Sequence, residues 1–218
     1  MLLNKCPDSI AVRFFCQYMD FFSLLLYFLV VIPSSIIHEY AHAWTADQLG
    51  DKTARYAGRL TIDPRAHIEL WGTILMPLVL YLTSGGRFMF AYAKPVPFNP
   101  YNLRDQKWGP ALVGIAGPLA NLLLAASFAL LIRILGGSSL RFFFEIIVYA
   151  NCMLLVFNLV PIPPLDGSKL LFAFFPDSAR SIQGVMERYG MVIVLFFVFF
   201  LVDFIQPLIS GLFNLLVG

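Results

Sequence analysis

Two histidines and a glutamate near the start of the chain have the spacing of a catalytic metal site. His38, Glu39 and His42 form the pattern HExxH. On a helix, residues four apart lie on one face with Cβ atoms about 5–6 Å apart, so both imidazoles can bind one zinc ion while Glu39 reaches a water molecule beside it. The preceding residues 21–37 carry no charge. Ionisable side chains next to such an apolar segment are costly within a bilayer and therefore indicate a functional site.

The composition of the chain is that of a membrane protein. Hydrophobic residues make up 59% of its 218 residues, 22 residues are phenylalanine and only 13% are charged, which is too apolar for an average soluble domain. A net charge of +2 is too small to indicate a nucleic-acid partner. The three cysteines are scattered without a CxxC pair, so they favour neither a disulfide framework nor a thiolate zinc site. The sequence predicts one multi-pass domain over residues 1–218 in a lipid bilayer.

Long apolar segments predict an all-α polytopic fold with about 4–6 transmembrane helices. Membrane-length helices are expected over residues 21–49, 109–135, 142–159 and 190–217, the last with an interruption near Pro207. We expect the catalytic core to occupy residues 21–176 and the C-terminal helices to occupy residues 188–218. Four crossings is the simplest count, and five or six remain compatible with the pattern.

Two further segments are expected to depart from regular transmembrane helix. Residues 70–83 are apolar over a length that is short for a full crossing, so a re-entrant or interfacial hairpin is expected, with a short tilted helix as the alternative. Residues 88–100 are rich in proline, which favours extended backbone of the kind found at a sheet edge. We expect this second segment to bind an unwound substrate chain as an added strand.

Basic residues orient the predicted helices. The loop over residues 51–67 contains Lys52, Arg55, Arg59 and Arg65, a density that the positive-inside rule assigns to the cytoplasm. With this orientation, and with about 1.5 Å of rise per helical residue, His42 and Asp166 both lie roughly 10–15 Å from the cytoplasmic face. The sequence therefore predicts that Asp166 meets the two histidines close to the cytoplasmic side of the cell membrane.

Three ordered motifs give the chain a resemblance to a known family. They are His38-Glu39-Tyr40-Ala41-His42, Gly117-Pro118-Leu119-Ala120-Asn121, and the segment Asn158 to Gly167 with the sequence NLVPIPPLDG. In this order and within apolar segments, they resemble the site-2 proteases, which are intramembrane zinc metalloproteases. The similarity extends from about residue 21 to residue 188. The chain looks like the compact branch that lacks PDZ and CBS domains, which leaves substrate selection open.

The resemblance implies a role for each motif. His38, His42 and Asp166 would bind one Zn²⁺ per chain, Glu39 would be the catalytic base, and Asn158 and Asn121 would position the substrate backbone or the developing oxyanion. Two imidazoles and one carboxylate leave a fourth zinc position open, which is typical of a catalytic site. The implied activity is hydrolysis of peptide bonds within or near transmembrane segments of protein substrates, as in regulated intramembrane proteolysis.

Other interpretations of these residues remain open from the sequence. Glu69 or Glu145 could replace Asp166 as the third ligand, although neither matches it in depth. Asp166 alone would be interpreted as a turn aspartate before Gly167, and Asn121 and Asn158 could simply bond neighbouring helices.

The remaining histidine and the other function classes are less consistent with the pattern. His67 follows a proline-containing loop and is expected to be structural. A metal-ion transporter would need no glutamate beside its first ligand and would show several sets of ligands along a path. A pseudoprotease that only retains membrane partners would usually have lost a catalytic residue, whereas all four are present here. The sequence leaves the oligomeric state undetermined.

Overall fold

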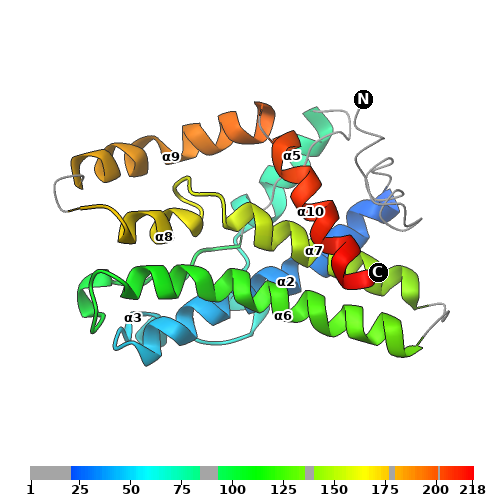
Figure 1. The fold of residues 1–218 in the computed structure, drawn as a ribbon, viewed down its shortest axis with the longest axis horizontal. Coiled ribbons are helices and arrows are strands. Elements are labelled where there is room, and N and C mark those ends of the chain that lie inside the picture. The colour runs from blue at the N-terminus through cyan, green and yellow to red at the C-terminus, as the bar shows by residue number, and fades with distance from the viewer. Residues whose placement is uncertain (1–20, 84–92, 136–139, 177–179, 201) are drawn as a thin grey trace.

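The computed structural model describes residues 21–83, 93–135, 140–176, 180–200 and 202–218, and within these ranges the chain is helical without a strand (Figure 1). The α-helices are α2 (Phe21–Gln48), α3 (Thr53–Tyr56), α4 (Pro64–His67), α5 (Met76–Thr83), α6 (Gly109–Leu135), α7 (Arg141–Asn158), α8 (Gly167–Ala173), α9 (Arg180–Phe200) and α10 (Val202–Val217). A π-helix, η2 (Leu70–Leu75), precedes α5, and a 3-10 turn, η3 (Pro100–Asn102), precedes α6. The predicted all-α fold is confirmed for the described residues.

Three long helices form the centre of the molecule. Helix α6 packs along both α2 and α7, and α2 also contacts α7. Figure 1 shows α2 in blue and α6 in green side by side, with α10 in red lying across α7. Small and branched side chains on α6 and α7, including Ala125, Ala129 and Val148, meet Phe213 of α10 in the largest apolar core cluster. Small residues allow the helix backbones to approach closely.

Helices α6 and α7 are the two described helices that are long and apolar enough to cross a membrane. Their bounds agree with the predicted segments 109–135 and 142–159 to within one residue. The apolar segment Leu70–Thr83 is helical throughout but short, as expected. The re-entrant or crossing path of this segment stays a prediction. The total of four to six crossings stays a prediction as well.

The C-terminal region differs in two respects from the expectation. Helix α9 begins at Arg180, earlier than the predicted start near residue 188. The first turns of α9 are polar, and the prediction followed only the apolar block that begins at Gly190. The expectation of an interruption near Pro207 is also wrong, because helix α10 continues through this residue.

A proline-rich turn separates α7 from α8. Residues 159–166 form a proline-rich turn that leads into α8, and Gly167 lies so close to Leu159 that a Cβ atom at residue 167 would stand 2.6 Å from the carbonyl oxygen of Val160. Ordinary contact begins near 3.4 Å, so the turn requires glycine there. Its last residue, Asp166, is the N-cap of α8 and is carried back toward α2 and α6.

Candidate metal centre

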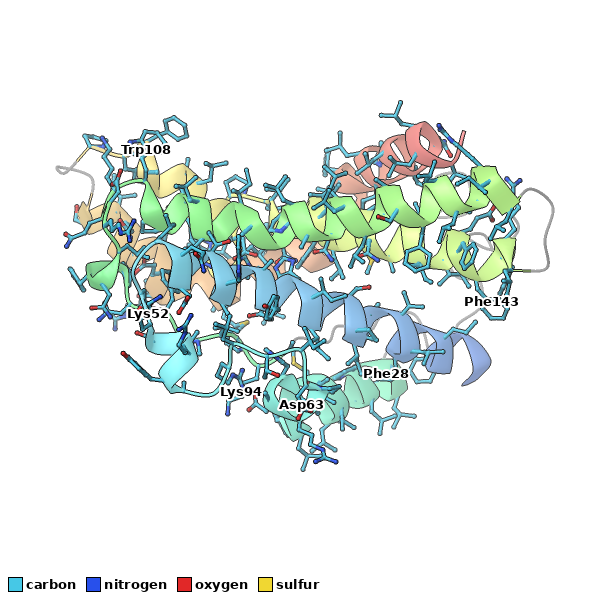
Figure 2. The ribbon with its side chains drawn as sticks, turned by 90° about the horizontal axis from the view of Figure 1, so that it is seen from below. Phe28, Lys52, Asp63, Lys94, Trp108 and Phe143 are labelled. Carbon is cyan, nitrogen blue, oxygen red and sulfur yellow. The ribbon has the colours of Figure 1, made fainter. Side chains whose placement is uncertain are left out.

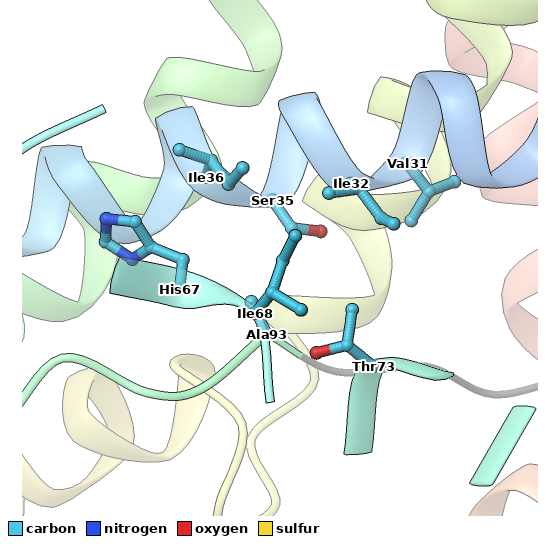
Figure 3. A pocket seen from close by; sticks show the side chains of 8 residues that line it. All are labelled: Val31, Ile32, Ser35, Ile36, His67, Ile68, Thr73 and Ala93. Atoms are coloured by element: carbon cyan, nitrogen blue, oxygen red, sulfur yellow. The ribbon is translucent and has the colours of Figure 1, made fainter. Parts of the chain in front are cut away.

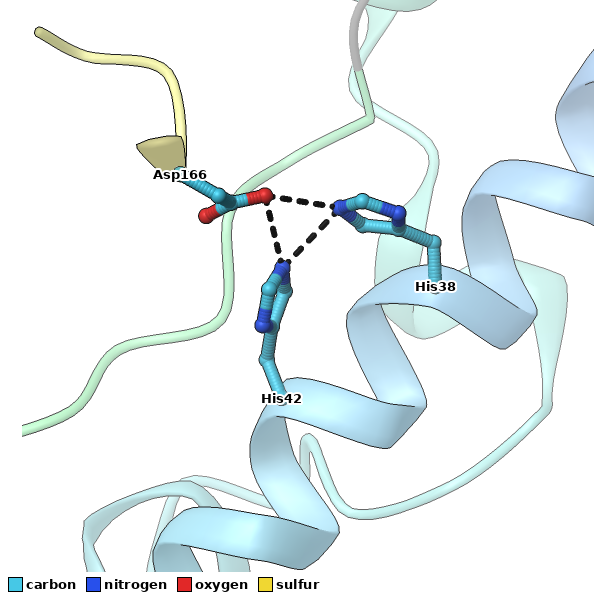
Figure 4. Close-up of side chains that lie close together, drawn as sticks. All are labelled: His38, His42 and Asp166. Atoms are coloured by element: carbon cyan, nitrogen blue, oxygen red, sulfur yellow. Dashed lines mark hydrogen bonds and ion pairs between the residues drawn. The ribbon is translucent and has the colours of Figure 1, made fainter. Parts of the chain in front are cut away.

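Asp166 and the two histidines of the HExxH motif meet inside the bundle (Figure 4). Asp166 Oδ2 lies 3.0 Å from His38 Nε2 and 3.0 Å from His42 Nε2, and the two Nε2 atoms are 2.9 Å apart. The three side chains are buried, with exposed fractions of 5% for His38, 7% for His42 and 7% for Asp166. The structure therefore brings together three residues that are up to 128 positions apart in the sequence.

The outer nitrogens of the two imidazoles are both bound to oxygen acceptors. His42 Nδ1 donates to the carbonyl oxygen of Val113 over 2.6 Å, and His38 Nδ1 donates to Asn121 Oδ1 over 2.5 Å. A carbonyl oxygen can only accept, so the proton of His42 is on Nδ1 and its Nε2 presents a lone pair. Three electron-pair donors then face one another at about 3 Å. A cation bound between them would offset the repulsion of these like partial charges.

The second oxygen of Asp166 has a partner of its own. Asp166 Oδ1 accepts a hydrogen bond from Lys169 Nζ over 2.7 Å, in the first turn of α8. This contact fixes the carboxylate plane and points Oδ2 at the histidines. Partners that hold the ligands of a metal in this way are a general feature of metal sites.

The donor set fits a zinc ion. Zinc in proteins prefers histidine nitrogen and carboxylate oxygen at about 2.0–2.2 Å, in a tetrahedron whose edges are about 3.3 Å. The three distances between ligand atoms, 2.9, 3.0 and 3.0 Å, are each within about 0.4 Å of that edge. His38, His42 and Asp166 can thus hold one zinc ion with little rearrangement and would leave one corner of the tetrahedron open.

Gly117 of α6 faces the Nε2 atoms of both histidines. A Cβ atom at this position would stand 2.5 Å from His38 Nε2 and would also collide with His42 Nε2. Gly117 therefore does more than let two helices approach. It leaves space beside the Nε2 atoms of the two imidazole rings.

The expected catalytic glutamate is bound to the proline-rich segment. Glu39 Oε2 accepts a hydrogen bond from the backbone N–H of Val96 over 2.9 Å. Residues 93–99 of the predicted edge have no regular secondary structure in the described part of the chain, and residues 88–92 lie outside the described residues. Pro95 and Pro97 flank Val96 and have no N–H groups. The only N–H between Lys94 and Phe98 is thus directed at Glu39.

Hydrogen bonds hold this segment at both of its ends. Lys94 N donates to the carbonyl oxygen of His67 over 2.9 Å, and Asn99 N donates to Asp51 Oδ2 over 2.6 Å. Burial raises the pKa of Asp51, but hydrogen bonds from Thr53, Asn102 and the backbone of Asn99 more than offset this and hold the pKa below its ordinary value. The carboxylate of Asp51 therefore fixes one end of the segment.

A buried arginine holds the middle of the same segment. Arg59, 9% exposed, donates to the carbonyl oxygens of Lys94 over 2.7 Å and Pro95 over 3.3 Å, and also to that of Ala66. The planar guanidinium can bond several carbonyls at fixed angles. Arg59 thereby connects the loop after α3 to the segment that reaches Glu39.

His67 lies apart from the metal ligands, as expected. It is fully buried, and its Nε2 donates to the carbonyl oxygen of Thr61 over 2.7 Å. Together with Ser35 of α2 and Ala93, it lines a cavity of about 10 Å³ between α2 and the segments that contain His67 and Ala93 (Figure 3). Such a cavity has room for about one water molecule, so it is not a binding pocket for a substrate side chain.

The alternative third ligands are remote from the histidines. Glu145 accepts a hydrogen bond from Arg141 over 2.8 Å, and neither it nor Glu69 belongs to the one group of described residues that could hold a metal ion. Asn158 donates to the carbonyl oxygen of Leu154 one turn earlier in α7, over 2.9 Å. Its contact with substrate stays a prediction. Asn121 has an exposed fraction of 0% and bonds His38, so the geometry supports a role in orienting that ligand.

Sequence reasoning missed two residues that support the site. Lys169 was not singled out, although its position three residues after Asp166 at the start of a helix is a recognisable signal. Asn151 was not singled out. Its polar side chain in the apolar middle of α7 was the available signal, and it bonds Asn121 over 2.9 Å.

Comparison with known proteins places the chain in a family. The model of peptidase family M50 matches residues 21–140 and 135–201. The chain is 36% identical over 197 residues to YwhC of Bacillus subtilis, covering 85% of this chain and 83% of that protein. It is 29% identical over 185 residues to Rip2 of Mycobacterium tuberculosis, covering 84% and 67% of the two chains. A protein of Methanocaldococcus jannaschii, MJ0611, is 27% identical over 177 residues, with 78% and 82% covered.

The names of these three relatives describe them as candidate zinc metalloproteases. No solved structure matches the chain. The family match spans the HExxH helix, the glycine-rich helix and the turn that carries Asp166, which are the three elements around the candidate metal centre. The chain therefore belongs to peptidase family M50, the site-2 proteases, and is a membrane zinc metalloprotease.

Proposed function

We propose that the protein is an intramembrane zinc metalloendopeptidase that cleaves peptide bonds within or near the transmembrane segments of other membrane proteins. The observation that carries this proposal is the buried group of His38, His42 and Asp166 between α2 and α6, with Glu39 next to His38. Its depth within long apolar helices is suited to a substrate that arrives through the bilayer.

In the proposed mechanism, His38, His42 and Asp166 hold the metal and Glu39 moves protons. A bound zinc ion supplies Lewis acidity at the open corner of the site. Glu39 takes a proton from the attacking water and returns it to the leaving amine. The Val96 N–H group keeps one oxygen of the Glu39 carboxylate in place, so the other oxygen is free for this transfer. Asn158 is the candidate donor to the developing oxyanion.

The substrate must unwind before it can be cut. A helical peptide bond is enclosed by its own hydrogen bonds, so an extended stretch has to form beside the metal ligands. Residues 93–99 are our candidate for the surface that receives this stretch, because they have no regular secondary structure and adjoin Glu39. Carbonyl groups of the segment would pair with substrate N–H groups.

We further propose a multi-pass topology with the active site toward the cytoplasm. Figure 2 shows Lys52 and Trp108 at one end of the molecule and Phe143 at the other. His42 lies ten residues before Lys52, in the second half of α2. The basic loop after α2 therefore supports a position of the site near the cytoplasmic face.

The first test of the proposed function is metal content. We expect about one zinc per chain in detergent-purified protein and a marked loss in Asp166→Ala, because the third ligand is removed. Full retention of zinc without Asp166 would refute the ligand assignment.

The second test separates catalysis from metal binding. In liposomes, the unaltered protein is expected to cut a labelled single-span protein with a helix-breaking pair in its span, at a bond mapped by mass spectrometry. Glu39→Gln should retain zinc and lose cleavage, because the base is absent while all ligands remain. A Glu39→Gln variant that still cleaves, or that loses its zinc, would contradict this division of roles.

A further inference from the structure

The structure assigns to Asn151 of α7 a positioning role for the zinc ligand His38, acting through Asn121. This inference rests on the proposed metal-binding function of His38. It concerns a side chain that touches neither the metal ligands nor Glu39, and it explains how one imidazole is made to direct its lone pair at the metal.

The argument starts from a single backbone carbonyl. Asn151 Nδ2 donates to the carbonyl oxygen of Ile147 over 2.9 Å and to Ser34 Oγ over 3.0 Å. The carbonyl can only accept, so the NH₂ group of the Asn151 amide must point at it. The other end of the amide, Asn151 Oδ1, is then necessarily an acceptor. Ile147 thus fixes which way round the Asn151 amide is oriented.

The same reasoning carries the orientation to the metal centre. Asn151 Oδ1 lies 2.9 Å from Asn121 Nδ2, which must donate to it. Asn121 Oδ1 is consequently turned toward His38, where it lies 2.5 Å from Nδ1 and accepts the proton of that nitrogen. The proton of His38 is therefore kept on Nδ1, and Nε2 presents its lone pair to the site.

Burial makes this chain of bonds necessary. Asn121 and Asn151 both have exposed fractions of 0%, and Ser34 has 5%, so bulk water cannot replace a missing partner. Without the acceptor on Asn151, the Asn121 amide could turn over and present its NH₂ group to His38. The proton of His38 would then be favoured on Nε2, where it competes with the metal.

The chain also connects three helices. Ser34 and His38 are on α2, Asn121 is on α6 and Asn151 is on α7. Each link joins neighbouring helices at the depth of the site, so the arrangement of His38 depends on the packing of α7 although α7 provides no metal ligand. His42 differs, because its Nδ1 donates directly to a backbone carbonyl.

The test measures the affinity of the purified protein for zinc by competition with a chelator. Asn151→Leu removes the acceptor while nearly keeping the side-chain volume, and we expect its zinc affinity to fall by about 10-fold or more, the range found for partners of metal ligands. Asn151→Ala, which removes the same acceptor without the bulk of leucine, is measured beside it in case the leucine variant does not fold. Zinc affinity equal to that of the unaltered protein in either folded variant would overturn the inference.

A second substitution distinguishes positioning from packing. In Asn121→Asp/Asn151→Leu, the carboxylate at position 121 has no NH₂ group to offer and can only accept from His38 Nδ1. We therefore expect the double variant to recover most of the lost affinity. A purely structural role of Asn151 would not be rescued in this way, and a double variant as weak as Asn151→Leu would refute the proposal.

The matched control lies two residues away on the same helix. Tyr149 accepts a hydrogen bond from Gln206 over 2.8 Å, which joins α7 to α10 and not to the helices that carry His38 and Asn121, so Tyr149→Phe should bind zinc normally. An equal loss in Tyr149→Phe would show that any weakened interhelical bond disturbs the site. The failure of the proposed function has a different signature, namely the absence of zinc from the unaltered protein.

Discussion

Gly117→Ala should empty the metal centre while leaving the helices in place. The added Cβ atom would stand 2.5 Å from His38 Nε2, whereas ordinary contact begins at 3.4 Å, so a ring or a helix must move by the difference, about 0.9 Å. Ligand positions in a metal site tolerate deviations of about 0.2 Å. The neighbour is a ligand ring held by a second hydrogen bond to Asn121, so the ring cannot simply rotate aside.

The expected size of this effect follows from the displacement. A misplacement of about 1 Å typically costs about 100-fold in a preorganised site, and we expect zinc affinity and cleavage rate to fall together by at least this order. Affinity is measured by chelator competition and cleavage in liposomes. Helix formation should improve slightly, because alanine has a higher helix propensity than glycine by about 1 kcal/mol.

The control for this prediction is Gly211→Ala in α10. A Cβ atom there meets no heavy atom within 4 Å, so the variant gains the same helix propensity without touching the site. It should bind zinc and cleave like the unaltered protein. Retention of one zinc and full activity in Gly117→Ala would refute the argument that Gly117 makes room for the histidines.

Three further predictions concern the elements that surround the site. Arg59→Lys should increase hydrogen–deuterium exchange of the amides in residues 93–99 and reduce kcat, because one ammonium nitrogen cannot replace the two guanidinium nitrogens that bond Ala66 on one side and Lys94 and Pro95 on the other. The folded protein should lose stability below about pH 4, seen in thermal melts over pH 3–6, with a smaller loss in Asp51→Asn. The pKa of Asp51 is lower in the folded chain than its unfolded value of about 3.9, so the stabilisation is complete above that value and disappears as pH falls through the folded pKa. Gly167→Ala should lower zinc content by moving Asp166, because the turn before α8 has no space for a Cβ atom.

Each of these predictions has an outcome that contradicts it. Unchanged exchange in Arg59→Lys, with the exposed Arg65→Lys as the control, would mean that Arg59 does not hold the segment. Equal dependence of thermal stability on pH for the unaltered protein and Asp51→Asn would show that Asp51 does not contribute to the loss of stability at low pH. Full zinc content in Gly167→Ala would show that the turn can adapt without moving Asp166.

Helix positions and the pairing of the two histidines on one helical face could be predicted because both depend on local sequence. The apolar segment that became α6 was predicted with the observed bounds, since a long apolar run leaves few alternatives. HExxH places two imidazoles on one helical face wherever the helix lies. The meeting of Asp166 with both histidines agrees with the expectation from membrane depth, although their role as ligands stays a proposal.

The supporting bonds could not be predicted because they depend on how helices rotate about their axes. Composition and hydropathy predict that a helix is buried, but they do not predict which of its side chains faces which neighbouring helix. Asn151 could have faced α10 or lipid, and the contact between Val96 N–H and Glu39 joins a segment of no regular structure to a helix. The start of α9 was misplaced for a related reason, because its polar first turns carry no hydropathy signal.

Substitutions at other positions should affect the orientations of the two histidines differently. His42 is oriented by the main chain at Val113, and a carbonyl oxygen is present whichever amino acid stands there. His38 is oriented by side chains, so its arrangement can be lost through changes at several positions on other helices. Substitutions near the two histidines should therefore differ in their effects. Exchanging the apolar residue that bonds His42 Nδ1 for another apolar residue is expected to be silent, whereas the polar residues that orient His38 can change only together.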